Sequence, residues 1–594
     1  MPKRISPSLL MPLPHFQIQT PSLAFQSETT GSLSLVDIQT GWRVLHIPTA
    51  YLFVPVIDGQ RAELTFSHGQ VISATRVDLH FTGEQFESFF LRIEGRPGDD
   101  AIAISCAFKL NRGSQLNQID FFPRETILDF YHIVNYRNRH GTEATWPELL
   151  PATSEGCKTD TYSTDWQFAP HPTLLIFQKH ELQLLFGAFD LPRAFGMYLE
   201  AADRKVRSWY LDYGQSPHGQ PLAAGEQFTS PAFLLFIRRD LTVEGILDTY
   251  ARMLIDARKI PDPAKKVRHA WWREPLYCTW IDQCLLSQAV VPIDLKEQAE
   301  QAAAATADPA GHALQESMVR RAVEVIEREK LPFRTILLDG GWSIATGQWE
   351  PDPHRLPHLR KLVDELHGKG FKIVVWWNWA EVSKSAQVNP AELIGGGKLN
   401  RHDARVRDYS LPSTQDYLRR LFHQLFSSDP GCYDLDGVKT DFLADKVHPD
   451  MPPGDPSWRG EENYFLQVSR LFYQEMKRHK PDAIHIGCAG NFWLAEYIDI
   501  NRTYDAGGTN HLQHETRGRM LRHTTPGTPV AYDFHNHLEN LNKYFASAHR
   551  NAASVQIGNI LMVQENMLSS GEPPSPDYFA MLRRELPFQQ IKRI

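Results

Sequence analysis

The sequence predicts a multidomain protein in which an N-terminal antiparallel β-sandwich precedes a (β/α)8 TIM barrel. The chain has 594 residues, which is more than one hydrophobic core usually organises. Its first part carries strand-length runs without helices between them, and its second part alternates strands with helices. We therefore expect a sandwich domain at residues 1–240, a helical linker at 241–265 and a catalytic-type barrel at 266–594.

The first 240 residues contain short runs that are rich in β-branched and aromatic residues and are separated by turn residues. This pattern is typical of strands, and two stacked antiparallel sheets are the usual way to bury them. A helix is expected from about residue 241 to residue 260, because Pro261 and Pro263 end its pattern. The strand-like runs are residues 50–56, 77–81, 101–108, 173–177 and 232–237.

Eight strand-like segments follow the linker, with helical patterns between most of them. Eight βα units fit a (β/α)8 barrel with inserted loops. A doubly wound sheet also alternates in this way, but it would carry a glycine-rich phosphate loop after its first strand, and the sequence has none there. The expected strands are 276–280, 335–342, 372–379, 437–442, 483–489, 500–505, 529–534 and 559–563, and the expected helices are 356–370, 413–427, 463–479, 538–554 and 577–586.

Composition and net charge indicate which kinds of partner and which compartment to expect. The formal net charge of -8 argues against a nucleic acid or an anionic membrane as partner, and no apolar run reaches the length of a membrane helix. Prolines at positions 7, 12 and 14 interrupt the segment after the N-terminal basic residues, so we expect no secretory signal. The six cysteines lack paired CxxC spacing, which favours reduced thiols and a cytoplasmic protein.

Reactive groups in such barrels stand at the C-terminal ends of the strands. Asp441 ends the expected fourth strand and Asp505 ends the sixth. Glycoside cleavage needs two carboxyl groups of this kind, one to attack and one to protonate the departing oxygen. Lys439 lies on the same strand face as Asp441, so we expect it to help keep Asp441 ionised. Asp505 must instead hold a proton, which calls for desolvation by neighbours such as Tyr504.

Five motifs in order along these strands resemble the α-galactosidase and raffinose-synthase family, glycoside hydrolase family 36, in the wider group with families 27 and 31. They are YCTW at 277–280, LLDGGW at 337–342, the long segment at 347–377, DGVKTDF at 436–442 and IDINRTYDAGG at 498–508. The resemblance implies an N-terminal β-supersandwich and retention of anomeric configuration through a glycosyl-aspartate, without a metal or organic cofactor.

The resemblance also assigns roles to single residues. It implies Asp441 as nucleophile and Asp505 as acid/base, acting on an oligosaccharide or glycoside. The sugar-binding residues that we expect are Asp339, Trp342, Trp376, Lys439, Cys488 and Arg502. Members of the family often form oligomers, so the resemblance leaves a homo-oligomer open.

Two departures keep other readings open. The family's tandem Asp-Asp is here Asp339-Gly340, and the segment around Asp505 lacks the usual Trp-Ser-Asp-Asp context. The main hypothesis is a retaining α-glycosidase, most of all an α-galactosidase. The alternatives are a raffinose-synthase-like transglycosidase, an enzyme for another hexose, and an inactive sugar-binding relative.

Structural readings of the same residues compete with these roles. Asp505 can be an ion-pair partner of Arg502, with Asp533 as the reserve acid. The tryptophans can be core residues. The motif His535-Asn536-His537 lies after the seventh expected strand, without an early partner pair, which disfavours a metal site.

Overall fold

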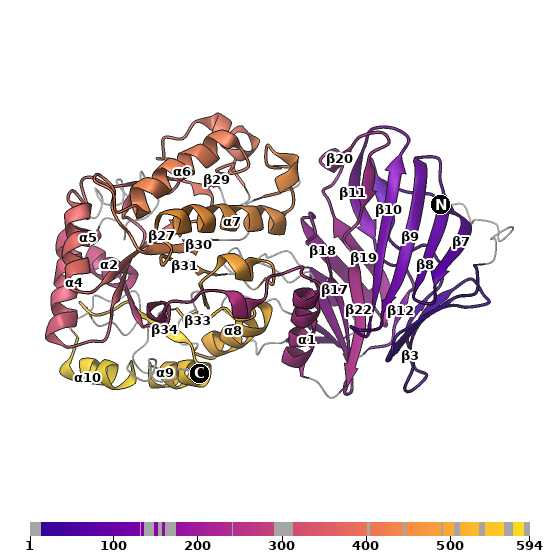
Figure 1. Cartoon of the computed structure of the whole chain (residues 1–594), viewed down its shortest axis with the longest axis horizontal. Coiled ribbons are helices and arrows are strands. Elements are labelled where there is room, and N and C mark those ends of the chain that lie inside the picture. The colour runs from indigo at the N-terminus through magenta and orange to yellow at the C-terminus, as the bar shows by residue number, and fades with distance from the viewer. Residues whose placement is uncertain are drawn as a thin grey trace.

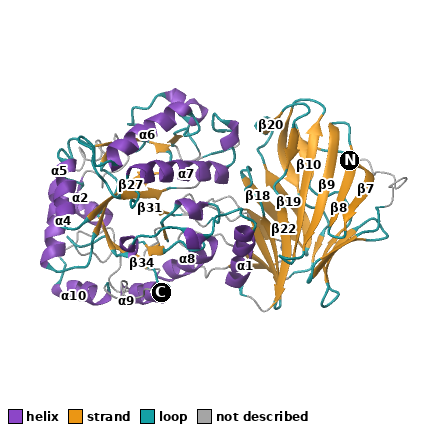
Figure 2. Cartoon of the chain, viewed as in Figure 1, coloured by secondary structure: helices purple, strands orange, loops and turns teal. Residues whose placement is uncertain are grey.

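The computed structural model describes residues 13–130, 132–135, 148–151, 157–160, 174–239, 242–289, 313–400, 404–442, 447–448, 450–488, 491–503, 511–533, 541–562 and 574–586. Two bodies lie side by side, a β-rich N-terminal part and a helix-covered barrel (Figures 1 and 2). The predicted fold class, a β-sandwich followed by a TIM barrel, is confirmed. The residue numbers given above for the domain boundaries stay a prediction.

Within the described residues, the N-terminal part has a twelve-stranded and a ten-stranded sheet, and the strand pairs are antiparallel. The first sheet contains β1 (Gln17–Gln19), β2 (Leu23–Ser27), β3 (Leu33–Asp37), β4 (Arg43–Ile47), β5 (Val54–Ile57), β6 (Gln60–Arg61), β11 (Ser114–Asp120), β12 (Ile127–Leu128), β15 (Cys157–Asp160), β18 (Gly196–Ala202), β19 (Lys205–Asp212) and β20 (Gln220–Leu222). The second contains β7 (Thr65–Ser73), β8 (Arg76–Thr82), β9 (Phe86–Arg96), β10 (Ala101–Leu110), β13 (His132–Asn135), β14 (Glu148–Pro151), β16 (Leu174–Lys179), β17 (Leu182–Ala188), β21 (Gln227–Thr229) and β22 (Phe233–Arg239).

Aromatic side chains fill the space between the two sheets. Trp209 of β19 in the first sheet meets Phe186 of β17 in the second, with ring centroids 4.6 Å apart. Phe186 also stacks on Phe233 of β22 at 4.8 Å, and Phe121 packs edge-on against Phe233 at 4.6 Å. Such rings bury large apolar areas, and this shared layer makes the two sheets one sandwich.

The eight parallel strands of the second part form a closed barrel. They are β23 (Leu276–Cys278), β24 (Thr335–Leu338), β27 (Lys372–Asn378), β30 (Gly437–Asp441), β31 (Ile484–Gly487), β32 (Ile500–Arg502), β33 (Val530–Tyr532) and β34 (Ser554–Ile557). The described helices are α1 (Val243–Asp256), which precedes the barrel, and α2 (Trp280–Ala289), α4 (Glu316–Arg328), α5 (Leu359–Gly368), α6 (Pro412–Phe426), α7 (Glu461–His479), α8 (His511–Thr524), α9 (Leu541–Arg550) and α10 (Pro576–Glu585). None of these helices is long and apolar enough to cross a membrane, as far as the described residues extend.

Short elements complete the described part of the loops. Two hairpins lie beside the barrel, and single turns of 3-10 helix link longer elements. The hairpins are β25 (Ser343–Ala345) with β26 (Gln348–Pro351) and β28 (Glu381–Val382) with β29 (Arg405–Val406). The 3-10 turns are η1 (Pro263–Lys265), η2 (Ala270–Arg273), η4 (Pro390–Glu392), η5 (Ile394–Gly396), η6 (Pro456–Trp458) and η7 (Leu494–Tyr497).

The predicted eighth strand at 559–563 is wrong, because β34 occupies Ser554–Ile557. The backbone N–H groups of Ile560, Leu561 and Met562 donate to the Asp282 carboxylate at 3.0 to 3.1 Å. These amides therefore donate to a buried carboxylate and not to a neighbouring strand. The helix expected to end at residue 554 accordingly ends earlier, at Arg550.

Asp282 lies in the first turn of α2 and is fully buried. The Tyr277 hydroxyl donates to it at 2.8 Å, beside the three backbone amides. Burial raises the pKa of Asp282 to about 7, against these hydrogen bonds, which favour the ionised form. Asp282 thus joins α2 to the turn after β34 and helps to close the barrel.

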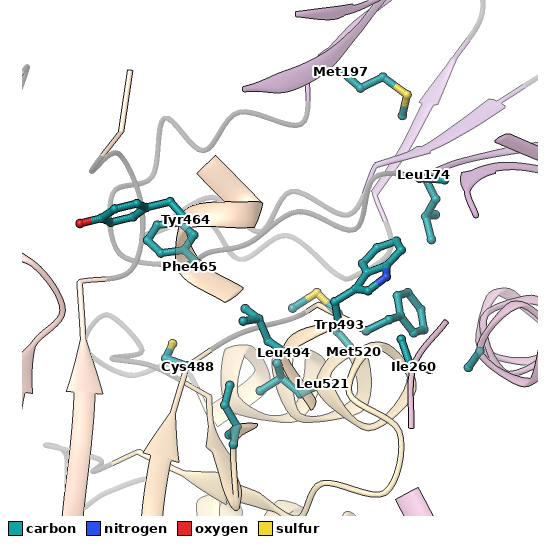
Figure 3. Close-up of a cluster of buried hydrophobic side chains, with 14 of the residues drawn as sticks. Leu174, Met197, Ile260, Tyr464, Phe465, Cys488, Trp493, Leu494, Met520 and Leu521 are labelled. Carbon is teal, nitrogen blue, oxygen red and sulfur yellow. The ribbon is translucent and has the colours of Figure 1, made fainter. Parts of the chain in front are cut away.

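The sandwich packs on the barrel through an apolar cluster (Figure 3). Leu174 and Met197 come from the sandwich, Ile260 from the segment after α1, and Trp493 and Met520 from the barrel, and all are buried. Burying such side chains stabilises the contact by about 1.5–3 kcal/mol each. The cluster thereby fixes the sandwich beside the loops that follow the barrel strands.

The loop before α7 approaches the sandwich at backbone level. Gly460 has a φ of +91°, and a Cβ there would lie 2.6 Å from the backbone carbon of Arg193. Next to it, the Arg459 guanidinium donates to the carbonyls of Tyr213 and His218. The sandwich therefore holds the end of the segment that leads from β30 to α7.

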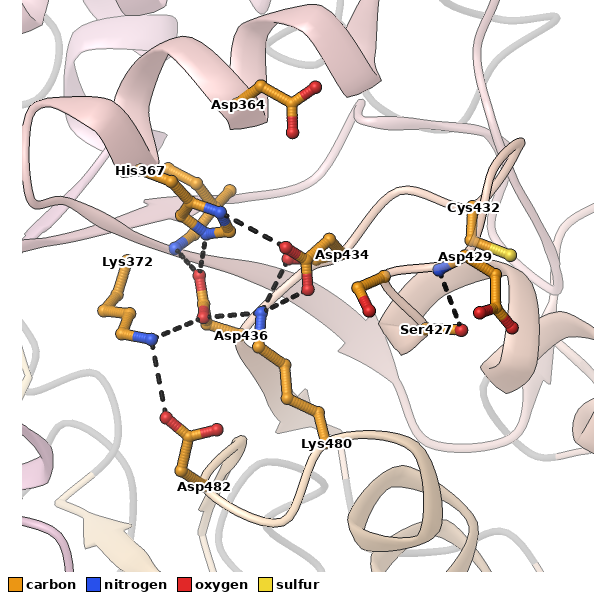
Figure 4. A network of polar contacts seen from close by, with 12 residues as sticks. Asp364, His367, Lys372, Ser427, Asp429, Cys432, Asp434, Asp436, Lys480 and Asp482 are labelled. Atoms are coloured by element: carbon orange, nitrogen blue, oxygen red, sulfur yellow. Dashed lines mark hydrogen bonds and ion pairs between the residues drawn. The ribbon is translucent and has the colours of Figure 1, made fainter.

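A network of charges closes the opposite end of the barrel, where the strands begin (Figure 4). Asp436 directly precedes β30 and accepts from His367 at 2.7 Å, from Lys372 at 2.9 Å and from the Ile373 N–H at 2.8 Å. Lys480 lies 2.8 Å from the same carboxylate. Burial opposes the ionisation of Asp436, but the His367 hydrogen bond and the Lys480 charge outweigh it, so its pKa lies below the usual value.

We predict that Asp436→Asn lowers the free energy of unfolding by about 3 kcal/mol, because the variant removes a fully buried carboxylate that pairs with Lys372 and Lys480. A depressed pKa stabilises the fold above the pKa of the unfolded chain, so the difference from wild type should be constant above about pH 5 and shrink below about pH 4. Urea unfolding at several pH values measures both effects. Asp364→Asn, at an exposed position of α5, is the control and should cost under about 0.5 kcal/mol; equal costs would contradict the prediction.

Candidate active site

The C-terminal ends of the barrel strands bring a compact set of polar side chains together. Parallel strands present these ends at one rim. Trp376 lies in β27, Lys439 and Asp441 in β30, and Arg502 ends β32. Asp339, Cys488 and Asp533 directly follow β24, β31 and β33. The rim therefore unites most of the residues expected from the sequence.

Asp441 ends β30 and is 7% exposed. The Trp376 indole N–H donates to its Oδ2 at 3.0 Å, and the Phe442 backbone N–H donates to its Oδ1 at 3.0 Å. Phe442 has a φ of +56°, in the left-handed region that bulky residues seldom adopt. The strained turn thus aims a backbone donor at the carboxylate and leaves Asp441 at the end of the strand.

Lys439 forms a buried ion pair with Asp339 and does not contact Asp441 directly. Its Nζ lies 2.9 Å from Asp339 Oδ2, and the Cys278 thiol donates to the same oxygen at 3.2 Å. Burial would lower the pKa of Lys439, but the Asp339 charge outweighs it and raises the pKa. Burial, with the Asp339 charge, raises the pKa of the Cys278 thiol far above its usual value. Lys439 is therefore a cation and Cys278 a neutral donor.

The turn at Asp339 is held from the start of α2. The Asp339 N–H donates to Thr279 Oγ1 at 3.0 Å, and Gln283 Nε2 donates to the Gly340 carbonyl at 2.7 Å. Thr279 and Gln283 also hydrogen-bond to each other. Sequence reasoning missed Thr279 and Gln283 as supports of this turn. The YCTW motif at 277–280 was the available signal, because it contains both Cys278 and Thr279.

Arg502 is fully buried and joins two carboxylates. One guanidinium nitrogen, Nη2, donates to Asp441 Oδ1, and the other, Nη1, donates to Asp533 Oδ2. Both contacts are ion pairs. Asp441 therefore has Arg502 as its neighbouring cation, where the sequence suggested Lys439.

Trp342 and Cys488 are both buried. Trp342 is fully buried, and its indole N–H donates to the Trp376 carbonyl at 2.5 Å. It packs near Trp349, which stacks on Trp377 at 4.4 Å. Burial raises the pKa of the Cys488 thiol to about 12. Trp342 thus supports the strand that carries Trp376, and a direct sugar contact of Trp342 or Cys488 stays a prediction.

Asp505, the expected acid/base, lies outside the described residues, as do Tyr504 and the His535-Asn536-His537 motif. His514 is described and buried, and its Nδ1 lies 2.7 Å from Thr503 Oγ1. Across the described part of the chain, no three His, Cys, Asp or Glu side chains are grouped so that they could hold a metal ion. The roles of all the site residues stay predictions at this point.

We predict that Lys439→Met costs about 3–5 kcal/mol of unfolding free energy, because it leaves the Asp339 carboxylate buried without its cation. Adding Asp339→Asn should recover part of that loss, with a coupling of about 1–3 kcal/mol in a double-mutant cycle. Urea unfolding of the four proteins measures it. Lys361→Met, at an exposed lysine of α5, is the matched control. If the losses of unfolding free energy in Lys439→Met and Asp339→Asn simply add in the double variant, the ion pair between the two side chains does not stabilise the fold.

Comparison with known proteins gives one match to a family model and several matches of fold. Residues 310–486 match the family model for the glycosyl hydrolases family 31 TIM-barrel domain. That segment contains Asp339, Lys439 and Asp441. No curated protein matches the sequence.

Solved structures resemble the chain along nearly its whole length. The α-galactosidase from Lactobacillus brevis has a TM-score of 0.60 and 14% identity, covering 97% of this chain and 83% of that one. A family 36 α-galactosidase from Geobacillus stearothermophilus, in complex with stachyose, has a TM-score of 0.60 and 12% identity, covering 97% and 86%. The α-N-acetylgalactosaminidase from Bifidobacterium bifidum has a TM-score of 0.62 and 10% identity, covering 97% and 93%. The expected resemblance is confirmed: residues 310–486 match the family 31 TIM-barrel domain model, and nearly the whole chain has the fold of family 36 structures.

Proposed function

We propose that this protein is a retaining α-glycosidase that hydrolyses terminal α-linked hexoses, most of all α-galactosides. The proposal rests on the groups that contact the Asp441 carboxylate. Asp441 lies at the end of β30, and it accepts hydrogen bonds from the buried Arg502 guanidinium and from the Trp376 indole N–H. A cation and hydrogen-bond donors favour the ionised form that a nucleophile requires.

In the proposed first step, Asp441 attacks the anomeric carbon. Its Oδ1 accepts hydrogen bonds from Arg502 and the Phe442 N–H, whereas Oδ2 accepts one from Trp376. We assign the attack to Oδ2, because the oxygen with fewer donors keeps more of its basicity. Asp505 would protonate the departing oxygen and later take a proton from the attacking water, and two inversions give net retention.

Asp339 and Lys439 are the proposed partners of the glycone hydroxyls. Their ion pair presents a carboxylate and an ammonium group side by side, which suits neighbouring hydroxyls. Gly340 takes the place of a second carboxylate, so Asp339 and Lys439 do not by themselves specify which hexose is preferred. The similar structures named above are α-galactosidases and an α-N-acetylgalactosaminidase, which supports galactose-type sugars.

We predict that wild type hydrolyses one member of a panel of aryl α-glycosides (galactoside, glucoside, N-acetylgalactosaminide) and that Asp441→Ala lowers the rate roughly 10⁴-fold. Azide should restore turnover of the variant and yield the β-glycosyl azide, because the anion takes the vacated place of the carboxylate. Product configuration by NMR is the measurement. An α-azide product, or full activity without azide, would exclude Asp441 as nucleophile.

We predict a different pattern for Asp505→Ala. Cleavage of an aryl glycoside with a good leaving group should form the glycosyl-enzyme readily, while a disaccharide should be cleaved about 10²–10⁴-fold more slowly, because its leaving oxygen needs a proton. Azide should now trap the intermediate as the α-glycosyl azide. Rates on both substrate classes, with wild type as reference, measure this. An equal loss on both would argue that Asp505 is not the acid.

A further inference from the structure

Asp533 is a buried carboxylate to which the proposed reaction gives no step. It directly follows β33 and is 0% exposed. Its backbone N–H donates to Thr503 Oγ1 at 3.1 Å, and its carbonyl accepts from the Tyr544 hydroxyl at 2.8 Å. Side chains from after β32 and from α9 thus fix the backbone, and the carboxylate reaches Arg502. These contacts hold the Asp533 carboxylate in one place beside Arg502.

Asp533 is better suited to carry a charge than to transfer a proton. An acid catalyst must hold a proton near neutral pH, and an adjacent guanidinium opposes that. Arg502 contacts Asp533 directly, so this carboxylate is placed as the ion-pair partner of a buried guanidinium. The sequence had suggested Asp533 as a reserve acid, and its contacts favour a different role.

Charged groups of both signs surround Asp441 on the described elements. The Cys488 thiol among them is neutral, because burial raises its pKa to about 12. The charged and titratable groups there are Cys278 at the end of β23, Asp339 after β24, Lys439 on β30, Cys488 after β31, Arg502 on β32, His514 and Arg517 on α8 and Asp533 after β33. Attack by Asp441 would remove the carboxylate charge that contacts Arg502 Nη2.

We propose that Asp533 is a positioning residue that holds Arg502 and balances its charge while Asp441 carries the glycosyl group. This inference rests on the proposed role of Asp441 as nucleophile. As the Asp441 oxygen bonds to the anomeric carbon, the glycosidic C–O bond breaks, and its electron pair leaves with the departing oxygen, which takes the proton of the acid. The Asp441 ester is neutral, so Arg502 keeps Asp533 as its carboxylate partner.

Removing only the charge of Asp533 should therefore have two effects. In the resting enzyme, Asp441 would no longer share Arg502 with a charged Asp533, so the guanidinium would favour its ionised form more strongly. In the glycosyl-enzyme, the buried guanidinium would lose the ion pair with Asp533, which is costly inside a protein. The first effect moves the pH profile, and the second slows formation of the intermediate.

The test uses full-length Asp533→Asn with the aryl α-glycoside that wild type hydrolyses. We expect the acidic limb of kcat/KM to move down by about one pH unit. We expect kcat to fall about 10²-fold, with KM changed less than about threefold. Asp533→Glu keeps the charge and should keep the limb at the wild-type pH. Asp436→Asn, a buried carboxylate at the opposite end of the barrel, is the control that should lower thermal stability without moving the limb.

Each outcome decides the inference. An unmoved limb in folded Asp533→Asn would overturn it, and so would a shift of equal size in Asp436→Asn. If Asp533→Asn does not fold, Asp533→Glu carries the test: a limb at the wild-type pH with reduced kcat supports the inference, and a displaced limb refutes it. Failure of wild type to hydrolyse any glycoside would instead contradict the proposed function, and the inference with it.

Discussion

The closure of the barrel is the constraint on which the site depends. β23 pairs with β34 through Leu276–Gln556 and Tyr277–Ile557, and this pairing turns the eight strands into a ring. Alternate strands of such a ring contribute side chains to one interior layer. Asp339 follows the second strand, Lys439 and Asp441 lie on the fourth, and Arg502 ends the sixth. Contacts between them cross an intervening strand, so they require the small radius of a closed barrel.

Closure of the barrel also buries charged side chains, and ion pairing between them offsets the cost of removing them from water. An isolated ion is costly there, whereas a hydrogen-bonded pair recovers much of the lost hydration. Asp339 with Lys439 and Arg502 with its two aspartates meet this condition. A single arrangement thus makes the interior stable enough to fold and places the Asp441 carboxylate at the rim beside a cation.

Much of this fold could be predicted from the sequence, because buried parallel strands are continuous apolar runs that end in polar residues. The third and fourth strands were expected at 372–379 and 437–442 and lie at Lys372–Asn378 and Gly437–Asp441. The eighth was misplaced, because the apolar run at 559–563 resembles a strand more than the segment Ser554–Ile557 does. Ion pairing was not predictable, since Lys439 and Asp339 are 100 residues apart. Only the folded ring decides whether Lys439 or Arg502 contacts Asp441.

The shared cations at the two ends of the barrel differ in burial. At the end where the strands begin, Lys480 contacts both Asp434 and Asp436, and its side chain is 14% exposed. At the rim, the Arg502 guanidinium contacts both Asp441 and Asp533 and is fully buried. A buried cation depends most on its counter-charges. In the proposed reaction, esterification of Asp441 leaves Arg502 in contact with Asp533, so the buried guanidinium keeps a carboxylate partner while Asp441, which ends its strand beside Trp376, loses its charge.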